Sequence, residues 1–232
     1  MALILNIDTA TDYASLALAS DGKLLELMKN PETRDHASWV HQAIHELLIK
    51  CGYSLQDLGA VAVTAGPGSY TGLRIGMSTA KGLCFVLDIP LIAVNTLKVM
   101  AAAFLSTVKD KGDLQVKGSS PVLVPMIDAR RMEVYTAIYD LELNEVKSPA
   151  ALILDKDSFN QWTTKYQLIC FGSGSKKFEA IASNKNCQFV EAEFDASALA
   201  SLSHEDFLQH RFADLAYAEP FYLKEFFSTG KK

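Results

Sequence analysis

The first hundred residues alternate between short apolar runs and stretches in which apolar side chains recur at helical spacing. Short aliphatic runs bounded by turn residues are typical of strands, and spacings of three and four residues are typical of amphipathic helices. The runs predict strands at 3–7, 13–19, 23–28, 60–64 and 91–94, and the helical spacings predict helices at 35–50, 73–87 and 95–108. Three meandering strands followed by alternating helices and strands indicate an α/β domain.

The polar stretch 109–121, which contains Gly112 and Gly118, predicts a linker or a long surface loop. After it the pattern begins again in a shorter and less regular form. Strands are predicted at 122–127, 133–139, 142–146, 152–154, 168–171 and 188–190, and helices at 155–165, at 175–183 and within 195–211. We therefore predict a duplicated RNase H-like fold with two α/β domains. The first covers 1–108, and the smaller second covers 109–232, with a last helix or tail that can pack back on the first domain.

A glycine-rich stretch at 66–76 joins the strand at 60–64 to the following helix. Ser69 and Thr71 are suitable N-cap residues for that helix. The free N–H groups and the positive dipole end of a helix start suit an anion. No Gly-Lys-Ser/Thr follows the glycines at the required spacing, so this is not a Walker A loop. A plain turn between strand and helix is the alternative.

The helix after this stretch carries Gly72, Gly76 and Ala80 on one face, at a spacing of four residues. A glycine inside a helix costs about 0.5–1 kcal/mol relative to alanine, so a close approach to this backbone is indicated. The spacing leaves open whether the neighbour belongs to the same chain or to another subunit. We predict that this helix and the helix at 35–50, from two subunits, form a symmetric four-helix interface in a homodimer. The predicted interface residues are Trp39, Val40, Ala43, Ile44, Leu47, Gly72, Arg74, Ile75, Gly76 and Ala80.

The composition of the 232 residues narrows the class of protein. Apolar residues make up 49% and charged residues 21%, which is enough apolar surface for a core. The net charge of −5 disfavours binding of nucleic acid by this chain alone, because phosphate neutralisation dominates that affinity. The four cysteines lack metal-ligand spacing and indicate a reduced protein. No apolar run has membrane-spanning length and the N-terminus lacks a basic signal region, so we expect a cytoplasmic protein.

Both halves place an aspartate at the end of their first strand, Asp8 and Asp128. This plan resembles the superfamily of actin, sugar kinases and chaperone ATPases, in which these two loops face each other across a nucleotide cleft. More specifically, four motifs resemble the bacterial TsaB family, also called YeaZ. These motifs are Asn6-Ile7-Asp8-Thr9-Ala10-Thr11, the stretch 66–76, Asp128-Ala129-Arg130-Arg131-Met132-Glu133-Val134-Tyr135, and Glu219-Pro220-Phe221-Tyr222-Leu223.

The resemblance implies a role in making threonylcarbamoyladenosine on tRNA, beside the anticodon. In that system a TsaD protein transfers the threonylcarbamoyl group, a small ATPase called TsaE joins the assembly, and TsaB is the non-catalytic partner. A homodimer is expected when the chain is alone, with tRNA reached only through the complex and no membrane involved. An independent ATP-dependent kinase or carbamoyl transferase of the same fold is the alternative, and a metallopeptidase is a third hypothesis.

The candidate anion or nucleotide cleft comprises Asp8, Thr9, Thr11, Asp128, Arg130 and Arg131. Asp8 could orient a metal-bound water and the threonines could meet phosphate, or all three could satisfy a tight turn. Nucleotide-binding relatives usually carry glycine after the second aspartate, so that backbone approaches phosphate closely. Ala129-Arg130-Arg131 stands there instead. We expect a degenerate site that requires no cofactor and binds ATP or ADP weakly at most.

A metal site is not predicted. His41 and His45 lie one helical turn apart and share a face, but no His-Glu-x-x-His pattern accompanies them. A solvated or interfacial helix face explains the pair.

Overall fold

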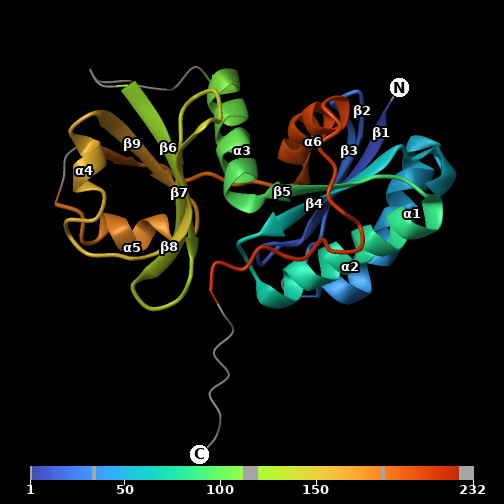
Figure 1. Cartoon of the computed structure of the whole chain (residues 1–232), viewed down its shortest axis with the longest axis horizontal. Helices are drawn as coiled ribbons and strands as arrows, with labels where there is room; N and C mark the ends of the chain where they lie inside the picture. The colour runs from blue at the N-terminus through green and yellow to red at the C-terminus, as the bar shows by residue number, and fades with distance from the viewer. Residues whose placement is uncertain (1, 33–34, 112–119, 184–185, 225–232) are drawn as a thin grey trace, which may run out of the picture.

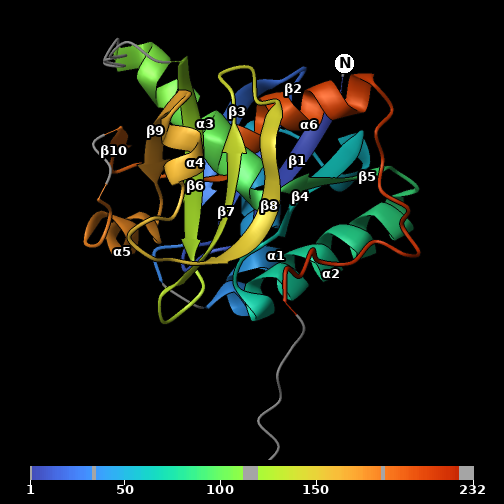
Figure 2. The same ribbon diagram turned by 60° about the vertical axis from the view of Figure 1, so that its left-hand side comes forward.

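The computed structural model describes residues 2–32, 35–111, 120–183 and 186–224, without the side chains of residues 109–111. It contains two five-stranded sheets with helices on both faces (Figures 1 and 2). The strands are β1 (Leu3–Asp8), β2 (Ser15–Ser20), β3 (Lys23–Lys29), β4 (Ala60–Gly66), β5 (Leu91–Asn95), β6 (Ser120–Asp128), β7 (Glu133–Tyr139), β8 (Glu145–Ile153), β9 (Tyr166–Phe171) and β10 (Cys187–Phe189). The helices are α1 (His36–Cys51), α2 (Tyr70–Leu87), α3 (Thr96–Lys111), α4 (Asn160–Thr163), α5 (Ser175–Glu179) and α6 (Leu199–Leu208), with short 3-10 turns at Leu55–Asp57 and Ala196–Ala198.

The two sheets share one topology. The first sheet has the order β3-β2-β1-β4-β5, and the second, read in the matching direction, has the order β8-β7-β6-β9-β10. Equivalent strands therefore occupy the same places in both sheets. In each sheet the first three strands are antiparallel, and the fourth and fifth pair in parallel. The predicted duplicated RNase H-like architecture is therefore confirmed.

Alternation along the first strand decides which helices cover which face of the first sheet. Leu3, Leu5 and Ile7 pack in one core cluster with side chains of α1 and α2. Ile4 packs on the opposite face, in a cluster with Leu199 of α6. α1 and α2 therefore lie side by side on one face of the sheet, and α6 covers the other (Figure 1).

Helix α3 lies between the two sheets (Figures 1 and 2). Val99 belongs to the core of the first sheet. Met100 and Phe104 belong to the core of the second, where Phe104 stacks on Phe171 with 4.7 Å between ring centroids. One helix thus shares its surface between both halves of the molecule.

Several predicted elements of the second half were wrong in extent. The two strands predicted at 142–146 and 152–154 are one continuous strand, β8. The helix predicted at 155–165 is reduced to α4, because Asp155 and Ser158 bond each other's backbone and side chains in a turn, which competes with a helix. The helix predicted at 175–183 ends at Glu179.

The stretch predicted as a linker begins later than expected, since α3 continues to Lys111 and β6 begins at Ser120. Residues 112–119 lie outside the described part of the chain, as do 225–232 at the end of the predicted tail. The boundary between the predicted domains stays a prediction, although α6 packs on the first sheet. No helix among the described residues is long and apolar enough to span a membrane.

Candidate functional site

Asp8 is the last residue of β1. Its side chain is 1% exposed, and its Oδ1 accepts hydrogen bonds from the Thr64 hydroxyl at 2.8 Å and the Ala10 N–H at 3.1 Å. Burial raises the pKa of this carboxyl, against the opposing effect of the Ala10 and Thr64 hydrogen bonds. Oδ1 of Asp8 is therefore occupied by groups of its own chain.

Thr9 joins the end of β1 to the first turn of α2. Its side chain is fully buried, and its hydroxyl donates to the Gly72 carbonyl at 2.7 Å. A Cβ at Gly72 would collide with the Thr9 carbonyl oxygen, and a Cβ at Gly76 would collide with Thr9 Oγ1. The glycines allow α2 to approach this loop closely, so the turn-forming interpretation of Asp8 and Thr9 fits the structure.

The prediction that Gly72, Gly76 and Ala80 meet another subunit was wrong. All three are buried, and the stripe faces the Thr9 loop and the first sheet. Most of the interface residues predicted on α1 are also buried inside this chain, because they belong to the core cluster on the same face of the first sheet. These core residues are Val40, Ala43, Ile44 and Leu47. Of the predicted interface residues, Trp39 and Ile75 are half-buried and Arg74 is exposed.

A cleft of about 1730 Å³ lies between the two sheets. Thr11, Asp128 and Arg130 line it, whereas Asp8, Thr9 and Arg131 are not among its lining residues. The structure thus brings only half of the six predicted cleft residues to the same space.

Asp128 is held by basic and backbone partners at the mouth of this cleft. Its Oδ1 lies 2.6 Å from Lys177 Nζ and accepts the Arg130 N–H, also at 2.6 Å. Burial alone would raise the pKa of Asp128, but the Lys177 and Arg130 bonds outweigh it and bring the pKa below its ordinary value. The carboxylate is ionised at neutral pH, with its Oδ1 committed to these two partners.

Arg130 and Arg131 adopt the left-handed backbone conformation, with φ of 70° and 48°. This region favours glycine, so two arginines here carry a backbone cost of about 1 kcal/mol or more each. Their side chains are exposed at the turn between β6 and β7. The turn therefore presents two guanidinium groups where a glycine would allow the backbone to approach a ligand closely.

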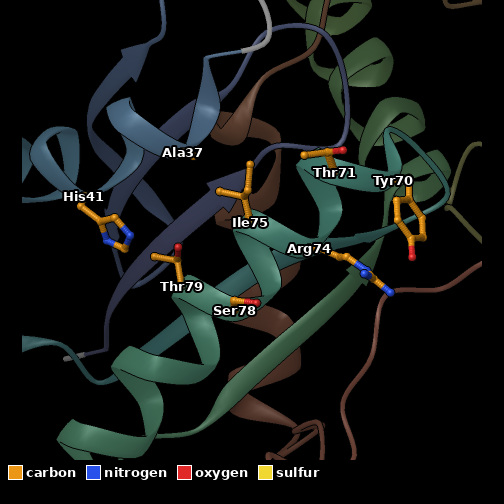
Figure 3. A pocket seen from close by; sticks show the side chains of 8 residues that line it. All are labelled: Ala37, His41, Tyr70, Thr71, Arg74, Ile75, Ser78 and Thr79. Atoms are coloured by element: carbon orange, nitrogen blue, oxygen red, sulfur yellow. The ribbon is translucent and has the colours of Figure 1, made fainter.

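A second hollow, which sequence reasoning missed, lies between α1 and α2 and is called here the α1–α2 groove. It has a volume of about 470 Å³ (Figure 3). Its lining residues are Ala37, His41, Tyr70, Thr71, Arg74, Ile75, Ser78 and Thr79. The exposed positions of α2 recur at helical spacing and were the available signal, but the prediction assigned the interface to the glycine stripe on the opposite side of the helix.

Large apolar side chains are exposed near the C-terminal ends of these two helices. Phe85 and Val86 of α2 are each 79% exposed, and Ile49 of α1 is 62% exposed. His41 and His45 are also exposed on α1. In the part of the chain that the structure describes, no three His, Cys, Asp or Glu side chains are placed to hold a metal ion. The outer surface of α1 and α2 therefore carries exposed apolar side chains beside two histidines.

We expect Asp8→Asn to be tolerated, with a stability difference from wild type that depends on pH. The raised pKa means that the native state keeps a proton that the unfolded chain loses as pH rises above about 4. The wild-type stability contribution of this group is present at low pH and is lost as pH rises through the native pKa, whereas asparagine has no such loss. Denaturant unfolding of both proteins between pH 4 and pH 8 should show the difference shifting in favour of Asp8→Asn. A flat difference would mean that folding does not raise the pKa of Asp8, and a shift the other way would mean that the native state stabilises its charged form.

The sequence of this chain is similar to those of known proteins. A family model described as tRNA N6-adenosine threonylcarbamoyltransferase, TsaD, matches residues 30–225. The tRNA threonylcarbamoyladenosine biosynthesis protein TsaB of Escherichia coli (strain K12) is 38% identical over 146 residues, which cover 62% of this chain and 57% of that protein. TsaB of Bacillus subtilis (strain 168) is 35% identical over 136 residues, which cover 59% and 54%. The chain thus spans little more than half the length of the curated relatives it matches.

A solved structure extends the similarity over the whole fold. YeaZ from Pseudomonas aeruginosa superimposes with a TM-score of 0.80 at 26% identity, covering 96% of this chain and 100% of that one. The chain belongs to the family described as tRNA N6-adenosine threonylcarbamoyltransferase, and to its TsaB (YeaZ) branch.

Proposed function

We propose that this protein acts in the biosynthesis of threonylcarbamoyladenosine on tRNA, as a non-catalytic partner of the subunit that transfers the group to the adenosine beside the anticodon. The names of its TsaB relatives support the pathway. One structural observation supports the non-catalytic role. The aspartate at the end of β1 is buried, its Oδ1 is hydrogen-bonded to Thr64 and Ala10, and it is not among the residues that line the cleft.

The proposed partner is a TsaD-like catalytic subunit, and a TsaE-like ATPase completes the assembly. The docking surface we propose is the outer side of α1 and α2, which includes the α1–α2 groove and the exposed side chains of Phe85 and Val86. A partner of related fold carries a similar pair of helices, so a second copy of this chain can use the same surface. The homodimer and the complex with the TsaD-like subunit should therefore exclude each other.

The tRNA is proposed to be bound by the complex and not by this chain alone. A net charge of −5 opposes the phosphate backbone. Two of the cations that line the cleft are already paired within the protein, Lys29 with Asp195 and Lys224 with Glu133.

Nucleotide is proposed to be unnecessary for the isolated chain, and we expect ATP or ADP to bind weakly at most. The physical reason is that Asp8 is buried and Arg130 occupies a glycine-like position. Calorimetric titration with ATP and magnesium should give a dissociation constant of about 1 mM or weaker, with no phosphate release. Tight binding with hydrolysis that Asp8→Asn abolishes would favour an independent ATP-dependent enzyme.

Association with the TsaD-like and TsaE-like proteins of the same organism tests the proposal. The full chain, mixed with these proteins and tRNA, should sediment as one complex, and the chain alone should not bind tRNA. If the chain forms no complex with the TsaD-like protein at micromolar concentrations, the proposed function is wrong.

A further inference from the structure

Residues 213–224, called here the strap, follow α6 and run along α2 (Figures 1 and 2). The strap begins with a bridge in which the Ala213 N–H donates to the Leu91 carbonyl at 2.8 Å. Lys81 of α2 then donates to the carbonyls of Ala216 and Ala218, at 3.3 and 2.9 Å. The strap is therefore attached along α2 through its backbone, and its side chains Ala213, Leu215 and Ala218 also pack against the core of the first sheet.

The far part of the strap is built into the end of β4. The Phe221 N–H donates to the Ala65 carbonyl at 2.6 Å. Gly66 has a φ of 114°, and a Cβ there would lie 2.6 Å from the Phe221 carbonyl oxygen. The glycine before Pro67 thus leaves the space in which the strap crosses.

Tyr222 connects the strap to the α1–α2 groove. Its hydroxyl accepts a hydrogen bond from Arg74 Nε at 3.2 Å, and its ring centroid lies 5.3 Å from that of Tyr70. The Arg74 guanidinium also lies over the Tyr70 ring, 4.2 Å from its centroid. Tyr70 and Arg74 line both the groove and the cleft, and Figure 3 shows them together at one end of the groove.

Two residues further on, Lys224 forms an ion pair with Glu133 of β7, on the second sheet. Both side chains retain some solvent exposure, at 43% and 15%. Ion pairs of this kind stabilise weakly. The strap is therefore held along α2 by several contacts, whereas its end at 221–224 is held by single contacts to Ala65, Arg74 and Glu133, and this end is the part that can open.

We infer that the strap couples the α1–α2 groove to the cleft, so that a protein partner engaging Arg74 through a carboxylate releases Tyr222 and loosens the tie between Lys224 and Glu133. This inference rests on the proposed docking of a partner at the groove. A carboxylate binds a guanidinium through two parallel hydrogen bonds, which together are stronger than the single bond that Arg74 donates to the uncharged Tyr222 hydroxyl. Because coupling between two sites is reciprocal, loosening the strap must also change the affinity for the partner.

The first test uses the isolated chain and needs no partner. Arg74→Gln removes the guanidinium that holds Tyr222, and the matched control Ser78→Ala changes an exposed groove residue. Hydrogen exchange of the Phe221 amide is the readout. Arg74→Gln should speed its exchange about tenfold or more, and Ser78→Ala should leave it unchanged. Equal protection in the two variants would overturn the coupling.

A second readout concerns the tie to the second sheet. Fluorescence energy transfer between one label on each half should report a wider distribution of distances in Lys224→Gln than in wild type. Arg74→Gln should widen it in the same direction, because both variants act on one strap. A wider distribution in Lys224→Gln alone would mean that Arg74 and the cleft are independent, which contradicts the inference.

The third arm adds the TsaD-like protein at saturating concentration. Exchange of the Phe221 amide should rise about tenfold on binding, and Tyr222→Phe should bind the partner about threefold to tenfold more tightly because Arg74 is released in advance. If the partner binds and the strap stays protected, the inference fails while the proposed function stands. If the partner does not bind, the proposed function fails, and the first two arms still decide whether the strap couples the two sites.

Discussion

Gly76→Ala is expected to destabilise the protein by about 1–3 kcal/mol or more, whereas Gly82→Ala in the same helix should leave stability unchanged or raise it by about 0.5–1 kcal/mol. Helix propensity alone favours alanine at both positions. The two sites differ in what the new Cβ meets. At Gly76 it collides with Thr9 Oγ1 and lies 3.3 Å from Val63 Cγ2, and at Gly82 it meets nothing within 4 Å.

Relaxation at Gly76 is restricted because Thr9 is buried and its hydroxyl already bonds the Gly72 carbonyl. Moving Thr9 aside breaks that bond, and moving α2 outward opens the core on the sheet. Chemical denaturation of both variants measures the difference. Equal stability of Gly76→Ala and Gly82→Ala would show that α2 is not held against the Thr9 loop. The glycine stripe would then be better explained by contact with another subunit.

Ser78→Arg is expected to weaken binding of the TsaD-like partner about 100-fold, or about 2.7 kcal/mol, without changing the fold. Ser78 is exposed and lines the α1–α2 groove, so a long charged side chain there fills the space that a partner helix needs. Ser106→Arg is the matched control, since Ser106 is exposed on α3 and is not among the residues lining the groove. Affinity measured by calorimetry should fall for Ser78→Arg only.

The same variant tests whether the homodimer and the complex share one surface. Sedimentation of the chain alone should show Ser78→Arg as a monomer and Ser106→Arg with the wild-type distribution. Thermal unfolding of both variants should match wild type, which keeps a loss of binding distinct from a loss of folding. Wild-type affinity for the partner in Ser78→Arg would place the docking surface elsewhere on the molecule.

The architecture followed from the sequence because each signal was local. Apolar runs gave the strands, the spacing on α1 identified Val40, Ile44 and Leu47 as one side of a helix, and repetition of the pattern gave the second sheet. Where several short polar residues bonded one another, as around Asp155, local chemistry overrode the apparent periodicity.

The candidate site was only partly predictable because its decisive contacts are long-range. Periodicity shows that Gly72 and Gly76 share a face but not that this face meets Thr9, more than sixty positions earlier. The residues around Asp8 in the sequence are compatible with a buried side chain and with one that faces the cleft, so the sequence alone does not distinguish the two placements. The contact between Arg74 and Tyr222 of the strap likewise leaves no recognisable pattern in the sequence.

The most direct measurement of the central claim is the rate of tRNA threonylcarbamoylation in a mixture of the TsaD-like and TsaE-like proteins, tRNA and the threonylcarbamoyl donor. Omitting this chain should reduce the rate at least about 100-fold. Adding the double variant Asp8→Asn, Asp128→Asn should restore it to within about twofold of wild type, because neither carboxylate takes part in the chemistry. A double variant that forms the complete complex yet leaves the rate about 100-fold low would contradict the account and assign catalysis to this cleft.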